Sequence, residues 1–361
     1  MKKINLAIIG GGLSNEREVS LMTSRQIAES LSRKKYNVSL VEIANNGKWI
    51  FRNDPVLFLS QFRKNGKNKN AAKKHPVVYG GGEKIPEKNF FKQKEKIDIA
   101  FIALHGKNGE DGKIQALLDL LGIAYTGSGV LASALGMNKA KCSEIVGSHK
   151  ISIPKFISFS SHNKNFKLIK ERIKKDIGYP CFVKPNESGS SIGISLVENE
   201  KDVLPAIKKA QKENGNILIQ ERIKGRELTC GVLGNTGQTD LVILPPVEII
   251  THESKFFDYK TKYFSKTVEE ICPAKIGKKI KRKVKNTAKR IHEILGCDGL
   301  TRSDFVLSSK NNKLYFLEIN TIPGQTQASL CPKEAKAMGI EFSKFLDMQI
   351  ELAIKKSKSK K

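Results

Sequence analysis

The sequence lacks three features that would each fix a class of protein. No stretch approaches the ~18 uninterrupted apolar residues of a membrane span. The N-terminus has no small-residue cleavage site of the kind that ends a signal peptide. The six cysteines are scattered, and no two stand in C-x-x-C spacing, which disfavours a zinc site or a disulfide framework. We therefore expect reduced thiols, a cytoplasmic location and no contact with a membrane.

Acidic residues are scarce, because 36 Asp and Glu face 64 Lys and Arg and leave a net charge of +28. Much of the excess lies in residues 63–96, on a helix expected at 276–295, and in the tail 355–361. A basic surface can indicate nucleic-acid binding. No helix-turn-helix, RNA-binding or aromatic-interleaved basic motif accompanies these segments. The pattern is more typical of solvated faces, and we do not expect a nucleic-acid partner.

The length and the order of elements predict an α/β chain of more than one domain. An apolar strand at 5–9, a glycine turn and a helix at 16–31 begin a Rossmann-like parallel sheet. We place the domains at 1–128, with a lysine-rich insertion at 65–96, at 129–225, and at 226–354, followed by the basic tail 355–361.

Further elements follow from apolar periodicity and from turn residues. In the first unit they are expected at 38–43, 98–104, 114–121 and 123–125. In the second unit we expect helices at 138–146, 166–177 and 201–211, and strands at 153–159, 180–184, 192–197 and 217–222. In the third unit we expect strands at 227–233 and 241–250, the helix at 276–295, a β-hairpin with arms at 300–307 and 314–320, and a helix at 341–354.

The predicted hairpin brings four polar side chains together. Residues two apart share a face of a strand, so Arg302 and Asp304 point the same way, as do Glu318 and Asn320. If the hairpin folds about residue 311, Asp304 faces Glu318 and Arg302 faces Asn320. Opposed carboxylates destabilise a sheet unless a positive charge lies between them. Their hard oxygens suit Mg²⁺; the alternative is a solvated charged face.

Three shorter motifs carry candidate binding residues. Gly10-Gly11-Gly12 resembles a phosphate turn but lacks the dinucleotide spacing, and Glu16 after it can complement the helix dipole or bind a ligand. Lys184 ends a buried-looking strand before the donor-rich loop 186–193, which suits phosphate oxygens; a plain flexible loop is the alternative. His105 follows a sheet strand in a glycine-rich loop, which favours substrate contact over a structural role.

Two more segments suit an anionic substrate. The glycine after Pro323 forms a turn whose backbone N–H can point at an anion, and Arg302 nearby can complete an oxyanion site. Residues 254–271 have no clean period and mix lysines with aromatic and hydroxyl residues. Such a long connection in a compact domain is a lid or a disordered segment, and its composition favours a lid over phosphates.

Taken in order, these motifs resemble those of the D-alanine–D-alanine ligase family of the ATP-grasp superfamily. The matching stretches are G-G-x-S-x-E-R-E-V-S at 11–20, L-H-G-x-x-G-E-D-G at 104–112, Y-T-G-S-G-V-L-A-S-A at 125–134, V-K-P-x-x-x-G-S-S-x-G at 183–193, K-G-R-E-L-T at 224–229, Y-x-x-K-Y at 259–263, D-G-L-x-R-x-D at 298–304 and L-E-I-N-T-x-P-G-x-T-x-x-S-L at 317–330. The resemblance implies an ATP-grasp fold after a Rossmann-like domain, with ATP held between the second and third units.

The resemblance also implies a role for each candidate residue. ATP would be held by Lys139 and Lys184 at the phosphates, Gln220, Glu221 and Ile223 at adenine, Glu227 at the ribose and Lys262 at the transferred phosphoryl group. Two Mg²⁺ (or Mn²⁺) ions would be held by Asp304, Glu318 and Asn320. The amino-acid substrates would meet Glu16 and His105 at the first site, Arg302 and Gly324 at the oxyanion, and Ser329 and Leu330 at the second carboxylate. Hydrogen bonds that link Glu16, Ser190 and Tyr263 would latch the lid.

The implied reaction joins two D-alanines through an acyl phosphate, for peptidoglycan precursor synthesis, in a homodimer. The first alternative is a ligase that joins D-alanine to D-lactate or D-serine; Tyr263 favours an amine acceptor. The second is a basic nucleic-acid-binding protein on an inactive ATP-grasp scaffold, which the intact hairpin residues disfavour. Gln220 departs from the glutamate of many relatives, so the adenine amino group would meet an amide oxygen, and we expect looser ATP preference.

Overall fold

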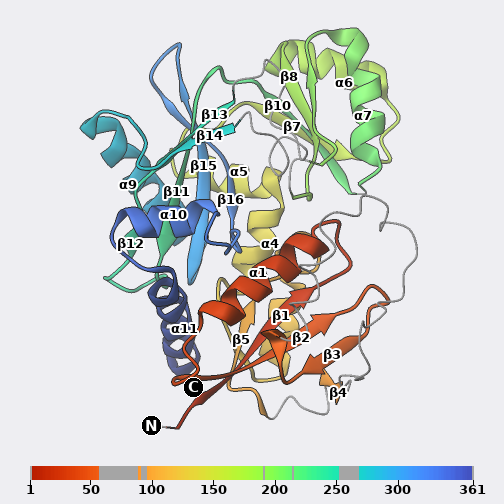
Figure 1. The fold of residues 1–361 in the computed structure, drawn as a ribbon. Helices are drawn as coiled ribbons and strands as arrows, with labels where there is room; N and C mark the ends of the chain where they lie inside the picture. The colour runs from red at the N-terminus through yellow and green to blue at the C-terminus, as the bar shows by residue number, and fades with distance from the viewer. Residues whose placement is uncertain are drawn as a thin grey trace.

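The computed structural model describes residues 2–56, 88–90, 96–189, 192–213, 215–251 and 268–359. Most of the predicted insertion at 65–96 and of the predicted lid at 254–271 lies outside these residues. Within the described residues, three sheets follow one another along the chain (Figure 1). The domain limits at 128 and 225 stay predictions.

The first sheet has the predicted parallel core. Its order is β4-β3-β2-β1-β5-β6, and β2, β1, β5 and β6 run parallel. The strands are β1 (Ile4–Gly11), β2 (Tyr36–Ile43), β3 (Trp49–Arg52), β4 (Lys88–Asn89), β5 (Ile99–Ile102) and β6 (Ala124–Tyr125), with helices α1 (Arg17–Ser30) and α3 (Lys113–Leu120). The sequence does not predict the antiparallel edge strands β3 and β4.

Strand β1 is buried on both faces, as a strand inside a parallel sheet must be. Leu6 and Ile8 pack on one face with residues of α1, whereas Ala7 and Ile9 pack on the other face with residues of α3. The carboxyl ends of β1 and β5 therefore lie side by side between two helical layers. The glycine turn and the loop that carries His105 begin at these ends, where open α/β sheets bind ligands.

The second sheet is antiparallel, in the order β7-β10-β8-β9. Its strands are β7 (Phe156–Ser160), β8 (Cys181–Pro185), β9 (Ser195–Val197) and β10 (Asn216–Glu221). Its helical segments are α6 (Phe166–Arg172), which continues as a π-helical turn (Ile173–Ile177), a 3₁₀ turn (Glu200–Asp202) and α7 (Val203–Gln211). Two helices connect it to the first sheet, α4 (Val130–Met137), which the sequence does not predict, and α5 (Lys139–Ser148).

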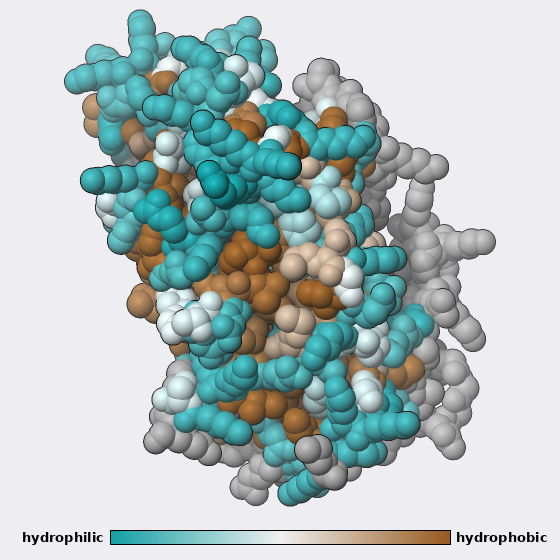
Figure 2. Space-filling view, turned by 90° about the vertical axis from the view of Figure 1, so that its left-hand side faces the viewer, coloured by the Kyte–Doolittle hydropathy of each residue, from teal (hydrophilic) through white to brown (hydrophobic). Residues whose placement is uncertain are grey.

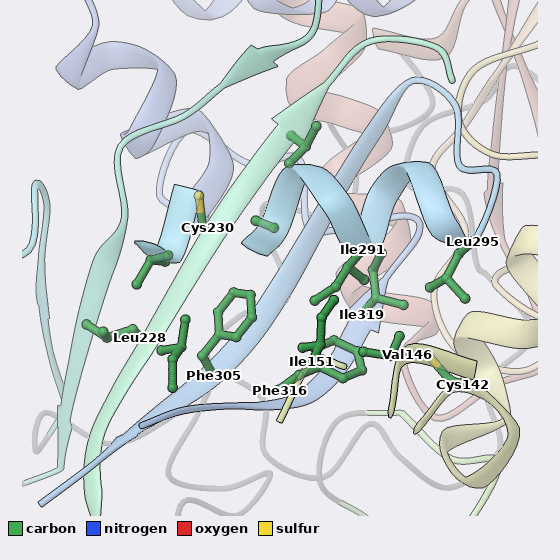
Figure 3. Close-up of a cluster of buried hydrophobic side chains, with 14 of the residues drawn as sticks. Cys142, Val146, Ile151, Leu228, Cys230, Ile291, Leu295, Phe305, Phe316 and Ile319 are labelled. Atoms are coloured by element: carbon green, nitrogen blue, oxygen red, sulfur yellow. The ribbon is translucent and has the colours of Figure 1, made fainter. Parts of the chain in front are cut away.

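The third sheet carries the predicted hairpin at its edge, in the order β14-β13-β11-β15-β16, with β12 paired to β11. Its strands are β11 (Gly225–Leu233), β12 (Val242–Ile243), β13 (Val247–Thr251), β14 (Val268–Ile271), β15 (Leu300–Ser308) and β16 (Leu314–Asn320). Helix α9 (Lys278–Ile294) packs on one face. Val284, Ala288 and Ile291 of α9 are fully buried there and form an apolar stripe along the helix. Figure 3 shows Ile291 among the buried side chains of this core.

The predicted single strand at 241–250 is wrong. The structure has the two strands β12 and β13 instead, separated by Leu244, Pro245 and Pro246. Proline has no backbone N–H to donate to a sheet ladder, so two prolines in succession end the pairing. Strand β11 therefore lacks a paired strand for part of its length on the side of β12 and β13.

The terminal helix is longer than the sequence predicts. Helix α11 spans Phe342–Ser359 instead of ending at 354, and it takes in most of the predicted basic tail. Its Leu346 and Ile350 join the core of the first sheet. Lys356 Nζ lies 2.9 Å from Asp298 Oδ2 and donates to Gly127 O at 3.2 Å. The last element thus ties the third unit back to the first (Figure 1).

The surface is mainly hydrophilic on the side where α9 and α11 lie, and hydrophobic residues gather near its middle (Figure 2). The outward-facing lysines of α9 belong to this solvated surface, since they stand opposite the buried stripe. Among the described residues, no helix is long and apolar enough to cross a membrane.

Candidate active site

Residues from all three sheets line one cavity of about 290 Å³. The first sheet contributes the start of α1 and the loop after β5. The middle of the chain contributes Lys139 at the start of α5 and the loop after β8. The third sheet contributes the hairpin and the segment that leads into helix α10 (Leu330–Ala337). The predicted site residues that this cavity brings together are Glu16, His105, Lys139, Arg302, Glu318, Asn320, Gly324, Ser329 and Leu330.

The hairpin pairs its polar residues as predicted. Asp304 stands opposite Glu318, and Arg302 stands opposite Asn320. A β-bulge lies between Asp304 and Phe305, and beyond it Phe305 pairs with Phe316. The register predicted from a turn centred on residue 311 is therefore correct on the cavity side of the bulge. Between the bulge and the turn, the register differs by one residue. The bulge is what sets the two carboxylates against each other.

Asp304 is held on both of its oxygens. Arg302 donates to Oδ1 through Nε and to Oδ2 through Nη2, both at 2.8 Å, and Thr229 Oγ1 donates to Oδ1 at 2.6 Å. Burial by itself lowers the pKa of Arg302, but the Asp304 carboxylate more than offsets this effect, so the pKa is raised and Arg302 stays charged. The bidentate pair fixes the guanidinium in one plane beside the cavity.

Thr229 is a functional candidate that reasoning from the sequence missed. It stands opposite Asp304 on the neighbouring strand β11. The side-chain alternation of the hairpin does not reach another strand, so only the pairing of β11 with β15 identifies Thr229. Glu110, Glu270 and Thr326 also line the cavity and were not singled out.

Two lysines converge near Glu318. Lys139 Nζ donates to Ser188 O at 2.6 Å and lies 3.5 Å from Glu318 Oε2. Lys184 is buried and donates to Gln220 Oε1 at 2.9 Å. Burial lowers the pKa of Lys184 to about 8; the Glu318 carboxylate opposes this shift and the Lys139 ammonium adds to it. The two lysines are cations that an anionic ligand would stabilise.

The amide of Gln220 is oriented by Lys184. Lysine has only donors, so the amide oxygen must face Nζ and the amide nitrogen must point elsewhere. Within the described part of the chain, Nε2 of Gln220 is buried without a hydrogen-bond partner. Because an unpaired buried donor is costly, this position suits a ligand that offers an acceptor. The amide oxygen that was expected to meet the adenine amino group thus already accepts a hydrogen bond from Lys184.

The other predicted ATP residues lie where β10 gives way to β11. Glu221 ends β10, and its Oε2 accepts from Lys155 N at 3.1 Å. Ile223 is half-buried in the connection. Burial, then the nearby Asp304 carboxylate, raises the pKa of Glu227. These three residues and Lys184, Gln220 and Asp304 do not line the 290 Å³ cavity; they lie along the junction of the second and third sheets.

The acidic end of the cavity is built around glycines. A Cβ added at Gly106 would lie 2.5 Å from Glu16 Oε2, and one added at Gly189 would lie 3.2 Å from it. Gly106 also has φ +71°, which favours glycine. His105 lies beside them, with Nδ1 3.8 Å from Glu110 Oε1 and Nε2 3.4 Å from Thr23 Oγ1. The arrangement gives the cavity a negative end that suits an ammonium group.

Ser190, Lys262 and Tyr263, the remaining predicted residues, lie outside the described residues. Gly189, which precedes Ser190, packs against Glu16, the residue expected to share the latch. The latch itself stays a prediction.

The fold and the cavity together define the class. A parallel α/β sheet precedes two antiparallel sheets, and Lys184 of one antiparallel sheet and Lys139 of α5 approach Glu318 of the other. This is the ATP-grasp architecture that the sequence predicts. The predicted fold class is confirmed by the solved structures that the chain matches along its length.

Comparison with known proteins places the chain within that class. The family model described as D-ala D-ala ligase N-terminus matches residues 5–128, and the model described as D-ala D-ala ligase C-terminus matches residues 145–351. A D-alanine–D-alanine ligase of Desulfotalea psychrophila is 39% identical over 362 residues, which cover 100% of this chain and 98% of that protein. The chain belongs to the D-alanine–D-alanine ligase family.

Solved structures agree over the full length. The VanG D-Ala:D-Ser ligase of Enterococcus faecalis has a TM-score of 0.80 at 32% identity and covers 98% of this chain and 100% of that one. The D-alanine–D-alanine ligase of Bacillus anthracis in complex with ATP has a TM-score of 0.75 at 26% identity, with 99% and 100% covered. The family thus includes relatives with different acceptors.

Proposed function

We propose that the chain uses ATP to join two D-alanines into D-alanyl-D-alanine through an acyl phosphate, a step in peptidoglycan precursor synthesis. The observation that carries this proposal is the hairpin. It presents Arg302, Glu318 and Asn320 to a cavity whose far end holds Glu16. Cations and carboxylates then flank the path from an ammonium site to a phosphate site. The ATP-bound relative supports the choice of nucleotide.

The residues at the two ends would position the substrates. Glu16, with His105 beside it, would bind the ammonium of the first D-alanine. Lys139 and Lys184 would hold the ATP phosphates, with Lys262 at the group that is transferred. The base and ribose would lie along Gln220, Glu221, Ile223 and Glu227. Most of the rate gain from such a site comes from orientation and charge complementarity.

Chemistry would proceed in two displacements. A carboxylate oxygen of the first D-alanine attacks the γ-phosphorus, the bond to ADP breaks, and an acyl phosphate forms. The amine of the second D-alanine then attacks the acyl carbon, loses a proton, and phosphate leaves. Arg302 and the Gly324 N–H would stabilise the tetrahedral oxyanion, while Ser329 and Leu330 would hold the second carboxylate. Ser190 and Tyr263 would complete the lid contacts that exclude water.

The hairpin residues fit divalent metal ions. Asp304, Glu318 and Asn320 supply the oxygen donors that Mg²⁺ or Mn²⁺ prefers. The three hydrogen bonds that Asp304 accepts from Thr229 and Arg302 leave a carboxylate lone pair for a metal. We therefore propose these residues as ligands of two Mg²⁺ ions, which when bound offset phosphate charge. We expect the family's cytoplasmic homodimer here too.

A second acceptor deserves a test because one matched structure is a D-Ala:D-Ser ligase. D-serine differs from D-alanine by a hydroxyl, and its amine can attack the same acyl phosphate. Tyr263, in the sequence of the lid, favours amine acceptors over D-lactate. D-serine is thus the better-supported alternative to a second D-alanine.

Phosphate release from ATP tests the proposal. Purified protein is assayed with Mg²⁺, with and without D-alanine. We expect release only with D-alanine. The proposal would be refuted if D-alanine did not change the rate of phosphate release. It would also be refuted if no phosphate were released and the protein bound DNA tightly and in a salt-sensitive manner.

A further inference from the structure

Helix α10 carries a fully buried carboxyl group that the proposed chemistry does not use. Glu334 lies one turn inside α10 and is 0% exposed. Its Oε2 accepts from the backbone N–H of Gly231 on β11 at 2.9 Å. The contact joins two segments 103 residues apart. Burial of a carboxyl group costs free energy, and this hydrogen bond offsets part of that cost.

The strand offers this N–H because its neighbour is interrupted. Strand β11 pairs with β13 as far as Thr229 and with β12 from Val232. Between them Gly231 O accepts from Leu244 N, while Leu244 O accepts from the Cys230 thiol. The two prolines that follow Leu244 restore no ladder. Among the described strands, none accepts from the Gly231 N–H on this side, and the Glu334 carboxyl group accepts from it instead.

Glycine at 231 is what lets the carboxyl group reach the strand. A Cβ added there would lie 2.5 Å from Glu334 Oε2 and 3.2 Å from Cys331 Sγ. Gly231 stands opposite Arg302, and Thr229 stands opposite Asp304. Helix α10 consequently packs on the face of the sheet that holds these site residues, opposite the face covered by α9.

The first residues of α10 face the cavity. Ser329 stands at the N-cap position of the helix and Leu330 begins it, and both line the cavity with Arg302 and Gly324. Ser329 Oγ also accepts from Thr326 N at 3.1 Å. The position of this helix end relative to Arg302 therefore depends on how α10 is fixed to β11. One other tie is near the surface, where Lys333 Nζ lies 2.6 Å from Glu270 Oε2.

We propose that Glu334 is a positioning residue: its bond to Gly231 fixes α10 on β11 and so places Ser329 and Leu330 to receive the carboxylate of the acceptor amino acid. This inference rests on the proposed function. It predicts that loss of the bond weakens binding of the second D-alanine far more than binding of the first D-alanine or of ATP. Burial raises the pKa of Glu334 to about 8, so the side chain is largely neutral at pH 7 and glutamine should replace it well.

The test compares Glu334→Met, which fills the space without an acceptor oxygen, with Glu334→Gln, which keeps one. Initial rates over a wide range of D-alanine separate the constants for the two amino-acid sites. Glu334→Met should raise KM for the acceptor about tenfold, the effect of losing one buried hydrogen bond, with KM for ATP and the first D-alanine within about twofold. Glu334→Gln should restore the acceptor KM.

Controls keep the outcomes separate. Lys336→Met changes an exposed side chain of the same helix and should change the acceptor KM less than about twofold. If Glu334→Met does not fold, Glu334→Asp, whose shorter side chain cannot reach Gly231, takes its place. The positioning role would be overturned if the acceptor KM did not change, or if the KM values for ATP and both D-alanines rose by the same factor. A wild-type protein that needs no D-alanine for ADP release would instead overturn the proposed function.

Discussion

At the scale of single residues, the two carboxylates of the hairpin have different surroundings. Asp304 is held by Arg302 and Thr229 on the sheet. The side chain of Glu318 is 40% exposed and reaches toward Lys139 in the cavity. Asp304 therefore has a fixed orientation in the sheet, while Glu318 faces the cavity.

The first prediction concerns Glu318. Glu318→Gln keeps the shape but removes the charge that would offset bound cations, so turnover should fall at least about 100-fold. Because the side chain is partly exposed, the thermal midpoint should stay close to wild type. Turnover and melting are measured together, with Glu293→Gln on the outside of α9 as the matched control. Near-normal turnover would remove Glu318 from the proposed metal site.

Gln220 gives a prediction about the nucleotide base. Among the residues that the structure describes, its Nε2 donor has no hydrogen-bond partner. The 6-oxo group of hypoxanthine is an acceptor, where adenine has a donor. Wild type should therefore use ITP appreciably, and Gln220→Glu should lower kcat/KM for ITP relative to ATP by about tenfold. Equal ITP-to-ATP ratios in the two proteins would show that Gln220 does not read the base.

Lys184 predicts a pH dependence. Its pKa is lowered to about 8, chiefly by burial, so in the free enzyme the ammonium is charged below that pH and neutral above it. The phosphate contact needs the charge, and kcat/KM for ATP should fall as pH rises through about 8. Lys184→Arg should flatten this limb because its guanidinium stays charged. Glu334→Gln should keep the fall in kcat/KM above about pH 8. If Lys184→Arg also keeps this fall, another group causes it.

At the scale of elements, contacts of Lys356 fix the C-terminal end of α11 to the rest of the fold. Lys356 pairs with Asp298, donates to Gly127 O, and lies 4.9 Å from the centroid of the Tyr125 ring. Side-chain exposures of 11% for Lys356 and 19% for Asp298 shield the pair from solvent. The contacts join α11 to β6 and to the loop before β15.

Removal of these contacts should destabilise the fold. Lys356→Met should lower the free energy of unfolding by about 1–3 kcal/mol, because charged contacts are lost and the partly buried Asp298 carboxylate loses its ion-pair partner. Lys355→Met, at the neighbouring exposed position, should change it by less than about 0.5 kcal/mol. Chemical denaturation measures both variants. Equal stabilities would mean that the end of α11 contributes nothing to the fold.

The sequence predicts elements whose partners are close along the chain. The hairpin is one, because a short turn fixes which of Arg302, Asp304, Glu318 and Asn320 face each other, and the register at the cavity is as predicted. Thr229 and Glu334 escape prediction because their contacts depend on the pairing of β11 with distant segments. Pro245 and Pro246 are enough to predict the break between β12 and β13, and the prediction of one continuous strand did not take them into account.

At the scale of the whole molecule, the charge of +28 and the cavity point to different partners. The lysines of α9 face solvent, away from the cavity. The cavity itself mixes cationic and anionic groups, as a site for zwitterionic and phosphorylated substrates requires. We therefore expect the excess charge to affect solubility and weak polyanion contacts, while the cavity determines the activity.

The most direct test identifies the product by mass spectrometry when D-alanine, D-serine and D-lactate compete in one reaction with ATP and Mg²⁺. D-alanyl-D-alanine should dominate, one ADP should form for each dipeptide, and chelation of the divalent ion should stop both. A main product of D-alanyl-D-serine would change the acceptor. ATP turnover without any ligated product would contradict the assignment of this cavity to amide ligation.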